Sequence, residues 1–260
     1  MDKPRLIALY DQHQRIDFAY LDKRREVTPH VVRHIALSAS REGEILFSQL
    51  DETNADELIR QQVNYFESLG QDFEWTVFDY DQPSDLKERL ASYGFKVGEA
   101  EALLVLDLDD APEVLWQPAQ HDVRRIRDTT KLGDILVVEE AVWQEDFAWL
   151  SDSLGKALRD YPDQMSIYAA YIDDHPVSAA WIYFPGKSQF ANLLGGATLN
   201  DFRKRGLYST LLAVRAQEAR ARGMRYLTVD PSPMSRPILE KFGFRLLAYW
   251  YGCKWKSKSA

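Results

Sequence analysis

The chain has little cysteine and no long apolar run, and each of these absences excludes a class of protein. Cys253 is the single cysteine among 260 residues, which excludes an internal disulfide and a structural zinc site built on cysteines. No run of about 18 apolar residues occurs, so no membrane-spanning helix is predicted. The start, Met1–Pro4, leads into no apolar segment typical of a signal peptide. We therefore expect a cytoplasmic protein.

Basic residues are fewer than acidic ones. Lys and Arg total 32 against 40 Asp and Glu, a formal net charge of −8. Such a chain repels phosphate backbones and anionic lipids, so we expect neither nucleic acid nor a membrane as a partner. His30 and His34 lack a third ligand in a recognisable pattern, so no metal site is predicted.

Length and composition indicate a two-domain globular protein. Hydrophobic residues make up 45% and charged residues 28%, and 260 residues suit two domains of about 100–150 residues each. An apolar run gives way to acidic and turn-forming residues at 106–113, which places a linker near residues 108–120. The predicted domains are residues 1–112 and 113–260.

The order of predicted elements occurs twice. Each half contains a helix, a strand, a short helix and a strand, at 55–69, 73–78, 83–93 and 102–108, and again at 207–222, 225–230, 233–242 and 246–255. Apolar residues recur at helical spacing within 55–69, and Gly70, Gly94, Gly223 and Gly243 are expected to end the four helices. Gly70 aligns with Gly223, and Gly94 with Gly243. This internal repeat indicates a duplication, the alternative being coincidence between two ordinary α/β stretches.

The second half contains further predicted elements before its repeat begins. We expect a strand at 123–127, helices at 130–143 and 146–160, a hairpin formed by 166–172 and 176–184, and a strand at 189–199. Strands that alternate with helices favour a mixed α/β sheet.

The strand at 189–199 leads into an arrangement that favours anion binding. Gly195 and Gly196 inside a strand suggest a bulge or the close approach of another backbone or a ligand. A basic turn, 203–206, and a helix beginning at Leu207 follow. Unpaired amides and the positive end of the helix dipole then point at one spot. Neither the nucleoside triphosphate loop nor the dinucleotide fingerprint is present.

The turn Arg203–Tyr208 resembles the Q/R-x-x-G-x-G/A loop of the GNAT superfamily of acyl-CoA-dependent N-acyltransferases. Arg203 and Gly206 match this pattern and Tyr208 departs from it. The segment Ile238–Phe244 is similar to the family's L-Y-x-x-x-G-F segment. The resemblance implies an α/β fold with a GNAT-like mixed sheet flanked by helices, and a smaller, degenerate GNAT-like N-terminal domain. In that domain the acidic segment Asp51–Ala55 replaces the basic loop, and an unrelated α/β domain is the alternative.

The resemblance also implies an acetyl-CoA site. Pantetheine pairs with the end of the strand, and the pyrophosphate sits on amides of the basic turn. The cofactor-binding residues so implied are Ala197, Thr198, Leu199, Arg203, Lys204, Arg205, Gly206, Leu207, Tyr208, Ser209 and Ser232.

Acyl transfer to an amine needs a neutral nucleophile, stabilisation of an oxyanion and a proton for the leaving thiolate. The position of the family's tyrosine acid holds Leu239, and that of a frequent asparagine holds Ser232. Tyr208, Ser232 and Tyr251 are the candidate proton donors. For the base we consider Glu139, Glu140 and Asp230, each with a solvated surface acid as the alternative. The predicted catalytic residues are Tyr208, Ser232, Glu139 and Glu140.

These features predict an acetyl-CoA-dependent N-acetyltransferase in which a primary amine of a small molecule or peptide attacks the thioester directly. The net negative charge favours a cationic acceptor. One alternative is a non-catalytic acyl-CoA-binding sensor or interaction module, and another is acylation of a protein N-terminus or lysine. The acceptor's identity and the oligomeric state stay open.

Overall fold

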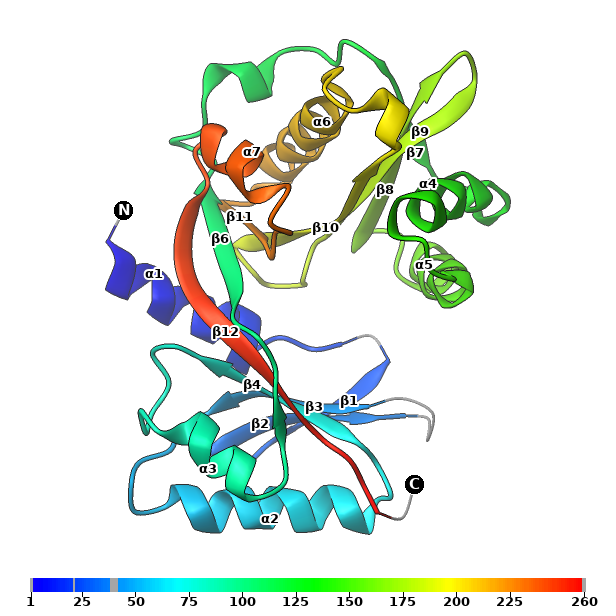
Figure 1. Cartoon of the computed structure of the whole chain (residues 1–260). Helices are drawn as coiled ribbons and strands as arrows, with labels where there is room; N and C mark the ends of the chain where they lie inside the picture. The colour runs from blue at the N-terminus through cyan, green and yellow to red at the C-terminus, as the bar shows by residue number, and fades with distance from the viewer. Residues whose placement is uncertain (1, 21, 38–41, 259–260) are drawn as a thin grey trace. The chain divides into compact units, whose positions relative to one another are not determined.

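The computed structural model describes residues 2–20, 22–37 and 42–258, and the chain divides into two compact units (Figure 1). The first unit is residues 1–104 with 246–260, and the second is residues 105–245. These units differ from the predicted domains, 1–112 and 113–260, because the C-terminal strand joins the first unit. There it pairs antiparallel with residues 73–78. A duplication boundary at residue 112 stays a prediction.

The first unit is a mixed sheet with helices packed against it. Its strands follow the order β1-β2-β3-β4-β12, in which only β3 and β4 run parallel. The helices are α1 (Lys3–Tyr10), the π-helix η1 (Asp11–Ile16), α2 (Ala55–Ser68) and α3 (Leu86–Ser92). The strands are β1 (Lys23–Val27), β2 (Val31–Ala36), β3 (Gly43–Ser48), β4 (Phe73–Phe78), the short β5 (Lys96–Val97), β6 (Glu101–Asp107), whose end lies in the second unit, and β12 (Arg245–Trp255).

The core of the first unit lies between its sheet and helices α2 and α3. The apolar spacing of α2 places Ile59 and Phe66 on one face, where both are fully buried. Phe66 stacks on Phe73 with ring centroids 4.1 Å apart, and Trp75 of β4 is also fully buried. The helix predicted from the apolar spacing of residues 55–69 is therefore present, and its apolar face packs in the core.

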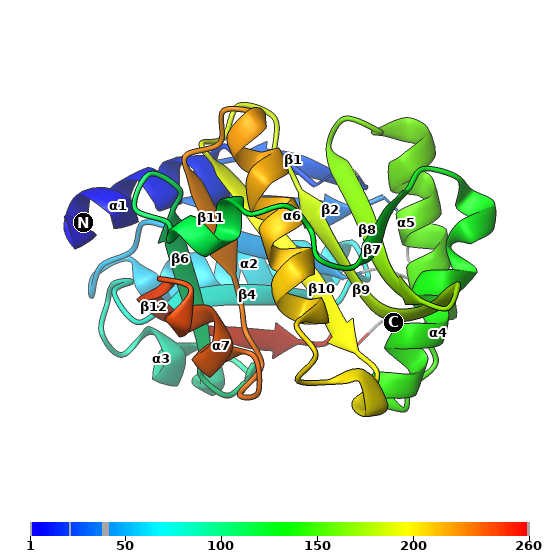
Figure 2. The same cartoon turned by 90° about the horizontal axis from the view of Figure 1, so that it is seen from above.

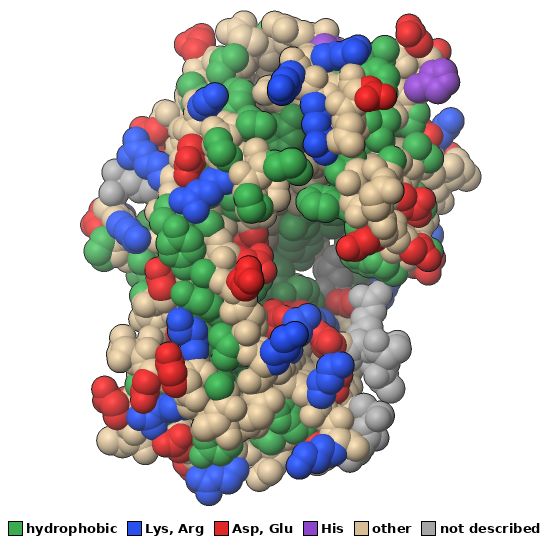
Figure 3. All heavy atoms as spheres, in the orientation of Figure 1, with side chains coloured by type: hydrophobic (Ala, Val, Ile, Leu, Met, Phe, Trp, Pro, Cys, Tyr) green, Lys and Arg blue, Asp and Glu red, His purple; other side chains and the backbone are tan. Residues whose placement is uncertain are grey.

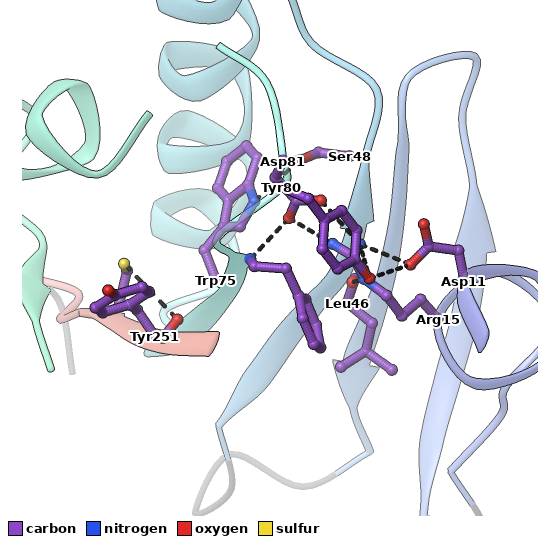
Figure 4. Close-up of polar contacts among 10 residues, drawn as sticks. Asp11, Arg15, Leu46, Ser48, Trp75, Tyr80, Asp81 and Tyr251 are labelled. Carbon is purple, nitrogen blue, oxygen red and sulfur yellow. Dashed lines mark hydrogen bonds and ion pairs between the residues drawn. The ribbon is translucent and has the colours of Figure 1, made fainter. Parts of the chain in front are cut away.

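A buried arginine fastens η1 to the sheet of the first unit (Figure 4). Arg15 is 2% exposed, and its guanidinium forms two hydrogen bonds with Asp81, at 2.9 and 2.6 Å. It also donates to the Leu46 carbonyl at 2.7 Å and to Asp11 at 2.9 Å, and it lies over the Phe78 ring. Because every interaction here satisfies another group of the same unit, this ion pair is structural.

The second unit is a sheet with helices on both faces (Figures 1 and 2). Its strands follow the order β11-β10-β9-β8-β7, antiparallel except between β10 and β11. Helices α4 and α5 cover one face and α6 the other. The elements are β7 (Asp122–Ile126), α4 (Gly133–Trp143), α5 (Ala148–Asp160), β8 (Met165–Ile172), β9 (His175–Tyr183), β10 (Phe190–Thr198), α6 (Leu207–Ala221), β11 (Tyr226–Val229) and α7 (Arg236–Lys241), with short 3-10 turns at Glu113–Trp116, Thr129–Lys131 and Asn200–Phe202. The predicted mixed α/β sheet is confirmed.

The two units repeat one local design. Helix α2 connects the parallel strands β3 and β4, and helix α6 connects the parallel strands β10 and β11. Gly70 and Gly223 end these helices at φ values of +60° and +76°. Gly94 and Gly243, at +91° and +89°, each precede a buried phenylalanine. This agreement in conformation supports the duplication predicted from the repeat.

Within the described chain, no helix combines the length and the apolar character that crossing a membrane requires.

Candidate functional site

The second unit contains a cavity of about 300 Å³ beside the N-terminus of α6. Its walls come from the end of α4, the end of β10, the basic turn, the first turn of α6, and the segment from Ser232 to α7. The lining residues are Val142, Trp143, Gly196, Ala197, Thr198, Phe202, Arg203, Lys204, Gly206, Leu207, Tyr208, Ser209, Ser232, Met234, Ser235 and Ile238.

Strand β10 bulges where it reaches the cavity. Its register with β9 shifts between Leu194 and Ala197, and Gly195 and Gly196 have φ values of +59° and +119°. A Cβ on Gly195 would lie 2.2 Å from the ring of Trp181, so no larger residue fits this backbone. The registered pairs of β10 with β11 cover only Phe190–Asn192. The predicted bulge is confirmed, and the backbone that follows it lines the cavity.

The N-terminus of α6 lies open at the cavity. Gly206 occupies the N-cap position at φ +83°, and no side chain caps the helix there. The first amides of an α-helix have no intrahelical partner, so those at the start of α6 are available to an anion. Arg203 and Lys204 line the same cavity, and Arg203 Nε donates to the Thr198 carbonyl at 3.2 Å. The turn is thereby fastened to the end of β10.

The turn before α2 in the first unit differs from the turn before α6, because a carboxylate binds its amides. The Asp51 carboxylate accepts hydrogen bonds from the amides of Thr53, at 2.8 Å, and Asn54, at 3.0 Å. Hydrogen bonds from the Thr53 hydroxyl and from the amides of Thr53 and Asn54 hold the pKa of Asp51 below its usual value, which keeps the carboxylate ionised at neutral pH. A negative charge therefore already lies in the turn before α2, where it would repel an anion.

Three hydroxyl groups meet on one wall of the cavity. Ser232 Oγ lies 3.1 Å from Ser235 Oγ, and Ser235 in turn forms a hydrogen bond with Tyr208. Burial raises the pKa of Tyr208, while the charge of Arg215 and the bond to Ser235 act in the opposite direction. Tyr208 therefore carries its proton at neutral pH. The wall can donate protons to a group in the cavity.

A buried carboxyl lies beside Trp143, one of the lining residues, without itself lining the cavity. Glu139 of α4 is 3% exposed, and its Oε2 accepts a hydrogen bond from Trp143 Nε1 at 2.9 Å. Its Oε1 is buried and has no hydrogen-bond partner in the described structure. Burial raises the pKa of Glu139 to about 7, with the Trp143 bond opposing that shift. The neighbouring Glu140 and the distant Asp230 are both exposed.

Some residues proposed from sequence lie elsewhere. Leu199 packs in the core beneath α4, and Arg205 lies over the Phe202 ring, so neither lines the cavity. Leu239 is fully buried, which agrees with an apolar residue at that position. Tyr251 belongs to the sheet of the first unit (Figure 4). The Lys87 ammonium lies 3.7 Å from its ring.

Sequence reasoning missed several lining residues, namely Val142, Phe202, Met234, Ser235 and Ile238. Ser235 had a local signal, because Ser232 and Ser235 form a serine-initiated turn in which the Ser235 amide bonds to Ser232 Oγ at 3.3 Å. No local sequence pattern marks the four apolar residues as part of a cavity wall. Among the described residues, no group of three or more His, Cys, Asp or Glu side chains is placed to hold a metal ion.

Comparison with known proteins gives a family match for part of the chain and a fold. Residues 132–244 match the model of the Acetyltransferase (GNAT) family. A GCN5-related N-acetyltransferase from Kribbella flavida has a similar structure, with a TM-score of 0.71 and 14% identity over 97% of this chain and 95% of that chain. No curated protein matches the sequence.

Two further solved structures have TM-scores of 0.63. A functionally unknown conserved protein from Staphylococcus epidermidis ATCC 12228 is 14% identical over 92% of this chain and 96% of that chain. A tandem GNAT protein from the clavulanic acid biosynthesis pathway is 13% identical, over 92% of this chain and 85% of that chain. These likenesses show the predicted GNAT-like fold of a mixed sheet flanked by helices.

Proposed function

Because residues 132–244 form a domain of the Acetyltransferase (GNAT) family, we propose that the protein is an acetyl-CoA-dependent N-acetyltransferase acting on a primary amine. One observation carries the proposal: the uncapped N-terminus of α6 and the bulged end of β10 line the same cavity. The first feature suits a pyrophosphate and the second an extended pantetheine arm.

The residues that would hold the cofactor fit an anionic, elongated molecule. Arg203, Lys204 and the amides of residues 206–209 would bind the pyrophosphate. The positive φ of Gly206 keeps a side chain away from that position. The backbone of Gly196–Thr198 would pair with the pantetheine arm. Acetyl-CoA supplies the acetyl thioester when bound.

Side chains of the protein would accept the proton of the amine and donate a proton to the leaving thiolate. Glu139 would accept the proton that the amine loses as its nitrogen bonds to the acetyl carbon, since its Oε1 has no partner and its pKa is about 7. Tyr208, with Ser232 and Ser235 as its hydroxyl neighbours, would donate a proton to the sulfur as the carbon–sulfur bond breaks. Amides at the β10 bulge would hold the carbonyl oxygen as it gains charge.

The direct test measures acetyl-CoA binding by calorimetry and free thiol release with a panel of amines, amino acids and peptides. The proposal expects binding together with thiol release that depends on the amine. Binding without release by any amine would contradict an enzyme and support the acyl-CoA-binding module suggested by Leu239.

We also propose that the acceptor is cationic. Glu139 bonds to Trp143, which is 46% exposed and lines the cavity, and the exposed Glu140 belongs to the same last turns of α4. A helix C-terminus and an indole face both favour a positive charge. Basic and acidic side chains are interspersed on the face shown in Figure 3, so the attraction would come from this local cluster.

For a cationic acceptor, kcat/KM should fall several-fold as ionic strength rises from about 0.01 M to about 0.15 M, because the Debye length shrinks from about 30 Å to about 8 Å. The measurement is made at saturating acetyl-CoA. A neutral amine of similar size is the control and should show little change. A preferred acceptor with net negative charge would contradict the proposal.

Calorimetry should give one acetyl-CoA site per chain. No side chain caps either helix, but the turn before α2 holds the Asp51 carboxylate, whereas the turn before α6 holds Arg203 and Lys204. Substituting Asp51→Ser keeps a side-chain oxygen in the turn before α2 and removes the charge, and we expect the stoichiometry to stay at one. Two equivalent sites in the unmodified protein would contradict this assignment.

A further inference from the structure

Arg215 is a buried cation without an acidic partner in the part of the chain that the structure describes. It lies in the middle of α6 and is 1% exposed. Its three hydrogen bonds go to backbone carbonyls, those of Leu211 at 3.1 Å, Trp181 at 3.1 Å and Leu194 at 3.4 Å. Arg15, the other large buried arginine, pairs with Asp81. A buried charge that lacks a counter-ion is costly, which makes a purely stabilising role a poor explanation for Arg215.

The two strand carbonyls that Arg215 holds belong to one strand pair. Leu194 of β10 lies opposite Trp181 of β9, and theirs is the last registered pair before the bulge. A bulge interrupts the ladder, so carbonyls beside it need another donor. Nη1 of Arg215 donates to both of them. One guanidinium nitrogen therefore joins the two strands where regular pairing stops.

The bulge is confined from the other face as well. The Trp181 side chain packs with the core under α4 and α5, and its ring would be 2.2 Å from any Cβ on Gly195. Arg215 approaches from α6, which covers the opposite face. The peptide between Leu194 and Gly195 is thus fixed by an indole ring on one face and by a guanidinium on the other. The residues directly after it, Gly196–Thr198, line the cavity.

We propose that Arg215 is a positioning residue that holds the β9–β10 bulge in the conformation in which the backbone of Gly196–Thr198 faces the cavity. Its effect on catalysis rests on the proposed acetyl-CoA site, but its effect on the strand does not. Losing the guanidinium frees the Leu194 carbonyl and lets the two glycines, which favour many backbone conformations, leave the bulged state.

The test compares Arg215→Met with Arg222→Met. Arg222 lies on the same helix and also donates to a backbone carbonyl, that of Asp163, but it pairs with Glu218 and does not contact the bulge. In Arg215→Met, amide hydrogen exchange over residues 194–198 should rise about 10-fold or more while exchange in the first unit is unchanged. The CoA dissociation constant should rise about 10-fold. Arg222→Met should change neither quantity more than about 2-fold.

Arg215→Lys provides the second variant if Arg215→Met does not fold. Lysine keeps the charge but lacks the planar guanidinium fork, so it should fold and still show faster exchange at the bulge. A folded variant with wild-type exchange and wild-type CoA affinity would overturn the proposal, as would equal effects in Arg222→Met. Failure of the unmodified protein to bind CoA would contradict the proposed function alone, because the exchange experiment needs no ligand.

Discussion

Replacing Glu139 with glutamine is expected to lower kcat about 100- to 1,000-fold at pH 7.5 and to leave acetyl-CoA affinity within about 2-fold. The substitution keeps the size of the side chain and its bond from Trp143 Nε1, but it removes the carboxylate that we propose as the proton acceptor. Because burial raises the pKa of Glu139 to about 7, the wild-type rate should rise with pH through that value. The rate of the variant should be flat there.

The same substitution should change stability in the opposite direction from activity. The folded pKa of Glu139, about 7, lies above the ordinary value of 4.5 for a glutamate, so the folded state binds the proton more tightly. Wild-type stability is therefore lost as pH rises from about 4.5 through about 7, by on the order of 3 kcal/mol. Glu139→Gln does not ionise, so its free energy of unfolding relative to wild type should increase over this range.

Glu140→Gln is the matched control. Glu140 is adjacent in sequence and exposed, so its substitution should change kcat less than about 3-fold and leave the pH dependence of unfolding unaltered. Equal losses of kcat in the two variants, or a Glu139→Gln rate that still rises through pH 7, would remove Glu139 from the role of base.

Substituting Gly206→Val should weaken acetyl-CoA binding at least about 30-fold, or about 2 kcal/mol. A β-branched side chain at the N-cap of α6 would project where the pyrophosphate is expected. The position also has φ +83°, and a Cβ there would lie 3.4 Å from His121 Nε2. The backbone strain should lower the free energy of unfolding by about 1–2 kcal/mol.

Gly223→Val is the control that introduces similar backbone strain without blocking the proposed pyrophosphate site. Gly223 lies just past the C-terminus of the same helix at φ +76°, and a Cβ there would meet no atom within 4 Å. This variant should lose a similar amount of stability and bind acetyl-CoA like wild type. If Gly206→Val binds as tightly as Gly223→Val, the pyrophosphate does not sit at the start of α6.

Local signals in the sequence determined much of the fold. The glycines at 70, 94, 223 and 243 were identified as ends of helices, and each has a positive φ. The apolar spacing of residues 55–69 predicted the buried face of α2. Gly195 and Gly196 predicted the bulge of β10, and the basic turn before Leu207 predicted the open helix end. Such features depend on a few neighbouring residues, so a short stretch of sequence is enough to reveal them.

Only the tertiary structure decided the features that depend on distant segments. Glu139 and Glu140 were equivalent in sequence, but the packing of α4 against β9 and β10 buries the first and exposes the second. The pairing of β12 with β4 assigns the C-terminal strand to the first unit. The role of Arg215 depends on two carbonyls that lie 34 and 21 residues away in sequence. Burial and long-range pairing arise from contacts between segments that no local pattern specifies, so they became visible only when the chain was folded.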